Sequence, residues 1–309
     1  MNSAATPSVV EASSRCSGVP YRCAFAVAGI GVEVTGSTPA SVDLGAQLQP
    51  FLTESDACEI QVRVEWKSTL DSCAGKELFH SGCVWNVCEL GDRYVFDFST
   101  GRFGSRPYKR LVVDRDFRRA TVLLNRQCMA ADDASRALEY PLDELLVTHR
   151  LSLAGGVELH ACGLVDAQGN SFLFSGHSGA GKSTTARLWT RHLPVHVLSD
   201  DRIIVREHNR QFFMHGTPWH GEAAFALPGN APIRRVFLLE HGTSNRIERI
   251  SRSVTAGELL ARSFTPFYAA RFVEPVLALL EALAESVPCY RFQFIPDASA
   301  VEKILGFRD

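Results

Sequence analysis

The sequence has no apolar run of 18 residues, and its net charge is only -2, with a pI of about 6.6. The first absence argues against a membrane-spanning segment, and the second leaves no basic field for nucleic acid or an anionic membrane surface. The first 15 residues also lack the basic start and apolar stretch of a signal peptide. We therefore expect a disordered tail over residues 1–18 and no nucleic-acid or membrane partner.

Cysteine pairs at the spacing of a structural site are also missing. The nine cysteines are an odd number in a chain of 309 residues, which argues against a disulfide framework. Cys83 and Cys88 have four residues between them, but no second pair follows at zinc-site spacing. Free thiols in a reducing compartment fit this pattern, so we expect a cytoplasmic protein.

The sequence does contain a change of pattern near residue 140. Residues 20–130 are rich in alternating apolar segments, such as EIQVRVEW, in which Ile60, Val62 and Val64 lie on one side. The segment LDELLVTHRLSLAGG then has helical spacing, and strands alternate with helices after it, an order typical of an α/β layer structure. We predict a smaller β-rich (α+β) domain over 19–140 and an α/β domain over 141–309.

Two elements near the end of the chain carry specific expectations. NRIERISRSV is typical of a strand with basic residues on it. FVEPVLALLEALAES has the apolar stripe of a buried helix face, and Pro275 is expected in the first turn of that helix.

The most specific motif lies between the predicted strand SFLFS and a helix predicted from Ser183 to about His192, and it fits G-x-x-x-x-G-K-[ST]. Its glycines allow a tight turn whose N–H groups point at phosphate oxygens, and the helix adds its positive end. Lys182 can reach the outer phosphates, and the Ser183 hydroxyl can bind Mg²⁺. The alternative is a glycine-rich connection with an exposed lysine. We predict that ATP, or GTP, is bound by Gly176, His177, Ser178, Gly179, Ala180, Gly181, Lys182, Ser183 and Thr184.

A pair of acids follows the next predicted strand, VHVLS. Only 17 residues separate Lys182 from Asp200, which leaves room for one short helix and one strand. A strand that ends in an aspartate is where a P-loop protein holds its metal, directly or through water. Two neighbouring carboxylates, Asp200 and Asp201, suggest two tasks: one holds Mg²⁺, and the other accepts the proton of an attacking hydroxyl. The alternative is a solvated turn at the end of a strand.

This layout resembles the catalytic domain of HPr kinase/phosphorylase and, more distantly, the nucleotide-binding half of ATP-dependent phosphoenolpyruvate carboxykinase. The resemblance covers residues 150–205 well and the rest of the C-terminal part loosely. It implies a P-loop kinase domain in which Ser183 and one of the two aspartates bind Mg²⁺ and the other aspartate is the base. It also implies a place near the phosphates for His160, although a lone histidine on an apolar strand is more often a satisfied core residue.

The sequence departs from that family after the Asp-Asp strand. HPr kinases have an Arg-Gly signature in the segment that shapes the acceptor site, whereas here the counterpart is MHGTPWHGE, with no arginine before Gly216. The identity of HPr as the acceptor is therefore open. Glycine and proline would fix a rigid turn in this segment. Its polar and aromatic side chains either face a substrate or form a stiff turn with Trp219 against the core; the candidate acceptor residues are His215, Trp219, His220 and Glu222.

We therefore expect an ATP-dependent kinase that transfers the γ-phosphoryl group to a hydroxyl of a peptide, a protein or a small molecule. The alternatives are a nucleotide-binding regulatory module that recruits a partner without transfer, and a lyase similar to phosphoenolpyruvate carboxykinase, for which the chain is short. The resemblance also suggests a homo-oligomer. The residues expected to carry catalysis are Asp200, Asp201, Lys182 and His160.

Overall fold

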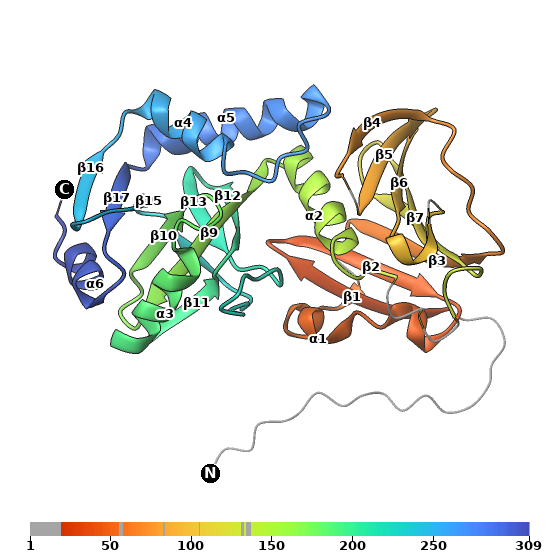
Figure 1. The fold of residues 1–309 in the computed structure, drawn as a ribbon, viewed down its shortest axis with the longest axis horizontal. Helices are drawn as coiled ribbons and strands as arrows, with labels where there is room; N and C mark the ends of the chain where they lie inside the picture. Colours follow the sequence, from red (N-terminus) through yellow and green to blue (C-terminus); the bar gives the residue numbers. More distant parts are fainter. Residues whose placement is uncertain are drawn as a thin grey trace, which may run out of the picture.

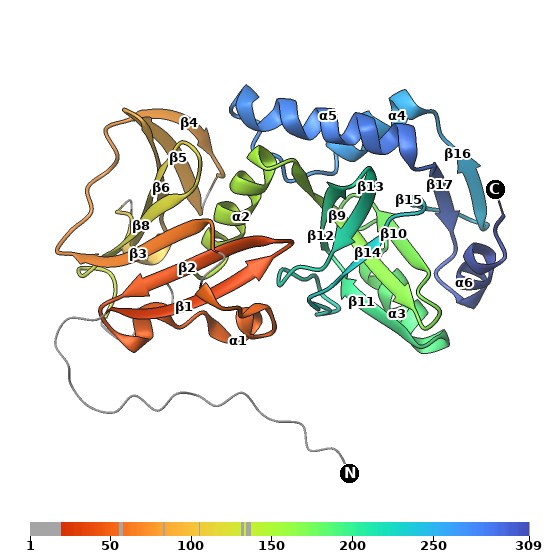
Figure 2. The same cartoon turned by 180° about the vertical axis from the view of Figure 1, so that it is seen from behind.

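The computed structural model describes residues 20–55, 58–82, 84–104, 106–130, 133 and 137–308. Two large mixed β-sheets lie side by side, with helices packed between and around them (Figures 1 and 2). The mixed α/β character predicted from the sequence is confirmed, with the β-rich half first. The predicted tail over residues 1–18 lies outside the described residues, as do Cys16 and Cys83.

The first sheet has eight strands in the order β1-β2-β3-β8-β7-β6-β5-β4. The β2–β3 and β3–β8 pairs are parallel, and the other neighbours are antiparallel. β4 is an edge strand with a mostly exposed pattern. The strands of the first sheet are β1 (Tyr21–Val27), β2 (Ile30–Gly36), β3 (Ile60–Lys67), β4 (Lys76–His80), β5 (Trp85–Leu90), β6 (Arg93–Phe98), β7 (Lys109–Asp114) and β8 (Arg119–Asn125). The short helix α1 (Gly45–Leu48) follows β2.

Helix α2 (Leu142–Leu153) joins the two halves, and Figure 1 shows it between the sheets. Leu142, Leu146 and Leu151 are fully buried in the apolar core of the first sheet, although the sequence pattern placed this helix in the second domain. Trp219 and Phe272 from the C-terminal half belong to the same core. The two halves therefore share apolar packing, which stabilises their relative placement.

The second sheet is mixed and follows the order β14-β13-β12-β9-β10-β15-β17-β16, with β11 also paired to β9. Helices cover both faces, with α4 and α5 on one side and α3 and α6 on the other. Its strands are β9 (Gly156–Asp166), β10 (Ser171–Ser175), β11 (Val195–Ser199), β12 (Arg202–His208), β13 (Gln211–His215), β14 (Asn230–Pro232), β15 (Val236–His241), β16 (Arg246–Arg249) and β17 (Cys289–Phe294). Its helices are α3 (Lys182–His192), α4 (Arg252–Leu260), α5 (Ala270–Ser286) and α6 (Ala298–Leu305).

The pairing of β9 decides where the site lies. The N-terminal half of β9 pairs with β12, and its C-terminal half pairs with β11. The chain therefore passes from β11 to β12 beside the middle of β9, and Asp200 and Asp201 occupy that crossing. The main-chain N–H of Ala161 donates to the carbonyl of Asp201 at 3.0 Å, which fixes the acid pair next to His160 on β9.

Several expectations about element bounds are wrong. The segment NRIERISRSV is not one strand, because β16 ends at Arg249 and Arg252 begins α4. Pro275 lies in the second turn of α5 rather than the first, because residues 270–274 extend the helix ahead of it. In the segment MHGTPWHGE, Met214 and His215 end strand β13, so the loop begins only at Gly216.

None of the helices in the described part of the chain has the length and apolar character needed to cross a bilayer. The cysteines that the structure describes are free thiols, as the odd count suggested. Three of them, Cys88, Cys162 and Cys289, are buried.

Candidate active site

The glycine-rich loop connects β10 to α3, as predicted. Gly179 and Gly181 have φ values of +80° and +100°, a conformation that side chains with a Cβ rarely adopt. A Cβ on Gly181 would also meet the ring of Phe294 at 2.7 Å. Residues 177–179 are exposed, and the first N–H groups of α3 have no partner within the helix. The loop therefore has the backbone shape and the helix end of a phosphate-binding cradle.

Lys182 begins α3 and folds back over the loop. Its Nζ donates to the carbonyls of Gly176 at 3.0 Å and His177 at 3.1 Å. The side chain is almost fully buried, and this burial lowers the pKa of Lys182 to about 8, although the charges of Asp201 and Asp200 act in the opposite direction. The exposed-lysine alternative is therefore wrong: Lys182 is an enclosed cation within the electrostatic reach of both acids.

Asp200 is fully buried, and four donors surround its carboxylate. The Ser183 hydroxyl donates to Oδ2 at 2.8 Å. Three main-chain N–H groups of the following loop complete the set, at 3.0 to 3.2 Å: Gly221, Ala223 and Phe225. Asp200 therefore ties the start of α3 to the loop after Trp219, and the solvated-turn alternative is wrong for this residue.

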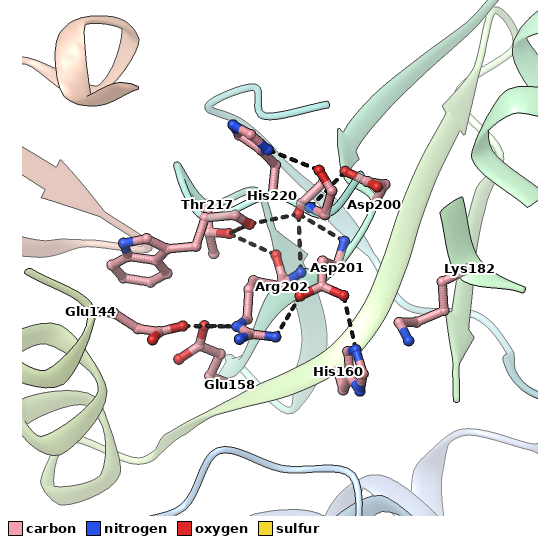
Figure 3. A network of polar contacts seen from close by, with 12 residues as sticks. Glu144, Glu158, His160, Lys182, Asp200, Asp201, Arg202, Thr217 and His220 are labelled. Atoms are coloured by element: carbon pink, nitrogen blue, oxygen red, sulfur yellow. Dashed lines mark hydrogen bonds and ion pairs between the residues drawn. The ribbon is translucent and has the colours of Figure 1, made fainter. Parts of the chain in front are cut away.

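Asp201 has different surroundings. Its Oδ1 lies 2.8 Å from His160 Nε2, and its Oδ2 accepts a hydrogen bond from Arg202 (Figure 3). Burial acts to raise the pKa of Asp201, but the hydrogen bond from His160 and the charge of Arg202 outweigh it and lower that pKa. Asp201 is thus an ionised carboxylate at neutral pH, and about a fifth of its side chain, 21%, is exposed.

Arg202 is the centre of a buried charge network. Its Nε donates to Glu144 Oε1 at 2.8 Å and lies 3.7 Å from Glu158 Oε1, while its guanidinium lies 3.7 Å from the centre of the Phe264 ring. Burial raises the pKa of Glu158 well above its ordinary value, and the charge of Glu144 adds to this. The other oxygen of Glu158 accepts from Thr148 at 2.6 Å. This network fixes Arg202 and through it Asp201, and Figure 3 shows Arg202 between Glu144, Glu158 and Asp201.

The four predicted acceptor residues do not lie together. His220 is exposed and, together with Trp219, lines a cleft of about 240 Å³ that Asp201 and Arg202 also line. The Trp219 ring is buried, and its Nε1 donates to Asp143 Oδ2 at 3.0 Å. Its side chain therefore packs against the core, as expected if the segment forms a stiff turn. His215 lies in a separate cavity beside Arg206, where burial lowers the pKa of His215 to about 4. Glu222 is exposed, and its carbonyl accepts from Arg187.

Sequence reasoning found His160 but missed Arg202, Glu144 and Tyr140 near Asp201. Arg202 directly follows the acid pair, and a basic residue at the start of a strand next to two acids was a signal for an ion pair. Tyr140, which lines the cleft, and Glu144, which pairs with Arg202, come from a segment about 60 residues upstream and have no motif, so only the fold brings them here.

The oxygen ligands present suit a magnesium ion. The Ser183 hydroxyl donates a hydrogen bond to Asp200. The lone pairs of its oxygen would then be free to face an ion in front of the loop. Asp200 would then orient the Ser183 hydroxyl rather than bind the ion itself. Asp201 is the second carboxylate close to this position. Among the described residues, no group of three or more His, Cys, Asp and Glu side chains forms a metal site of its own, so the remaining ligands would be phosphate and water.

Comparison with protein-family models finds no match for this chain, and comparison with curated proteins finds none either. The functional reasoning therefore depends on the geometry of the site.

Proposed function

We propose that this protein is an ATP-dependent phosphotransferase, in which the second sheet is a P-loop kinase domain of the HPr kinase type. One observation carries the proposal: the loop between β10 and α3 folds Lys182 back over its own carbonyls, within electrostatic reach of both acids, and bonds Ser183 to Asp200, while Asp201 lines a separate cleft. An enclosed cation and a hydroxyl at a phosphate-type loop, with two acids beside them, are the components that phosphoryl transfer from a nucleoside triphosphate requires.

The two acids have different roles in this proposal. Asp200 holds the Ser183 hydroxyl for Mg²⁺, which would neutralise charge on the phosphates when bound. Asp201 accepts the proton of the acceptor hydroxyl. The oxygen of that hydroxyl forms a bond to the γ-phosphorus as the bond between this phosphorus and the leaving ADP oxygen breaks. His160 and Arg202 position the Asp201 carboxylate, and Lys182 stabilises the charge on the transferred group.

Incubation with γ-labelled ATP, Mg²⁺ and a panel of hydroxyl acceptors tests the proposal. The panel contains free serine, HPr and serine-containing peptides, and ATP binding is measured separately by calorimetry. We expect labelled product from at least one acceptor, and Lys182→Ala should abolish it. Tight ATP binding without transfer to any acceptor or to water would instead support a nucleotide-dependent regulatory module. No heat from ATP or GTP would overturn both.

A further inference from the structure

A cavity of about 630 Å³ lies where the two halves of the molecule meet. One wall is the β4–β5 edge of the first sheet, and the others are the start of α2 and the segment that precedes α5. Figure 1 shows β4 opposite that segment, and the Phe79 and Tyr268 rings stack across the junction with their centroids 6.4 Å apart. We call this cavity the aromatic pocket; its principal lining residues are Phe79, Trp85, Tyr140, Phe264, Phe267 and Tyr268.

The aromatic pocket exposes apolar surface to an unusual degree. Ten large apolar side chains are exposed among the described residues, and four of them line this one cavity. They are Phe267 at 57%, Tyr140 at 53%, Phe79 at 43% and Val84 at 41%. Grouped exposed apolar side chains around a cavity are typical of a ligand site.

The charges in the aromatic pocket cancel one another. Arg202 and Glu144 are its oppositely charged residues, and they pair with each other at 2.8 Å. Burial lowers the pKa of His149 to about 3, so this ring is neutral. The remaining polar residues are hydroxyl side chains such as Ser81 and Thr265. A lining of this kind suits an uncharged apolar group and does not favour an anion.

The aromatic pocket adjoins the candidate active site. Tyr140 and Arg202 line both this pocket and the smaller cleft that contains Asp201 and His220. Arg202 also donates directly to Asp201. A molecule with its apolar part in the pocket can therefore extend past Tyr140 and present a hydroxyl to Asp201.

We infer that the aromatic pocket binds an uncharged ring or branched aliphatic group of the phosphoryl acceptor. The acceptor is thus a hydroxyl compound with a bulky apolar group close to the hydroxyl, and the first sheet takes part in choosing it. This inference rests on the proposed kinase function for the role of the ligand, while the pocket itself can be tested without ATP.

The test uses two neutral probes, N-acetylserine benzylamide and N-acetylserine methylamide. Binding is followed without nucleotide through the emission of Trp85, and Trp85→Phe identifies that signal. Labelled transfer to the two probes is then compared. We expect the benzylamide to bind, and to react with a kcat/KM roughly tenfold to a hundredfold higher than that of the methylamide. The reason is that a buried phenyl ring removes about 100 Å² of apolar surface from water.

Phe267→Ala and Phe79→Ala should reduce this preference severalfold, and both residues are exposed enough that the fold should tolerate the change. Leu305→Ala is the matched control, because Leu305 is an exposed apolar residue on α6. Benzylamide binding without transfer would support the pocket and overturn the kinase. Equal transfer to both probes, unaffected by Phe267→Ala, or no benzylamide binding, would overturn the pocket.

Discussion

The proposed nucleotide side and the proposed acceptor side of the candidate site are built in different ways. The nucleotide side comes from one continuous segment, β10 to α3, and closes on Asp200, which is fully buried and receives four hydrogen bonds. The acceptor side combines Asp201, half-buried and ion-paired, with residues of both halves of the chain. The first side is densely hydrogen-bonded around Asp200 and encoded in one segment, whereas the second is partly exposed and depends on how the two sheets meet. Two adjacent aspartates can therefore have distinct tasks.

The largest expected effect distinguishes the two aspartates by their chemistry. Asp201→Asn keeps the shape of the side chain but removes the proton acceptor, so we expect phosphoryl transfer to fall by roughly 10²- to 10⁴-fold. The affinity for ATP should change by less than about threefold, since Ser183 bonds to Asp200 instead. Single-turnover release of label and calorimetry with Mg²⁺ measure the two quantities.

Asp92→Asn is the control for this prediction, because Asp92 is an exposed carboxylate on the first sheet. If Asp201→Asn transferred phosphate at the normal rate, the assignment of the proton acceptor would be wrong. If Asp201→Asn lost ATP binding instead, the nucleotide side and the acceptor side would not act independently.

A second prediction concerns stability. Asp200→Ala leaves three main-chain N–H groups without their charged acceptor in the interior, and we expect it to lower the free energy of unfolding by about 3 kcal/mol. Asp201→Ala should cost only about 1 kcal/mol, because Asp201 is partly exposed and Arg202 keeps Glu144 as a partner. Urea denaturation of the two variants measures the difference, and equal losses would contradict the contrast between the sides.

The same contrast explains which parts of the candidate site could be predicted from the sequence. The loop, the helix after it and the strand that leads into Asp200 are contiguous, so spacing and residue type were enough to predict them. His160 came from a resemblance and does lie 2.8 Å from Asp201. Glu144 and Tyr140 could not be predicted, because Glu144 reaches Arg202 and Tyr140 reaches the cleft only through the placement of α2 and the residues just before it between the two sheets. Trp219 was ambiguous because a partner for its indole, Asp143, lies 76 residues away.

The smallest expected effect tests the nucleotide side by pH. Burial lowers the pKa of Lys182 to about 8, so the ammonium form that attracts phosphate declines above that pH, far earlier than for an ordinary lysine. The affinity for ATP should therefore fall as pH rises from 7 to 9, approaching about tenfold per pH unit above 8. Lys182→Met should bind weakly with a flat profile over the same range. Wild-type affinity that stayed constant to pH 9 would show that Lys182 is not titrating there, whereas a decline that persisted in Lys182→Met would assign the titration to another group. The acceptor side offers a further contrast, because the pKa of Asp201 is lowered and its charge is constant over this range.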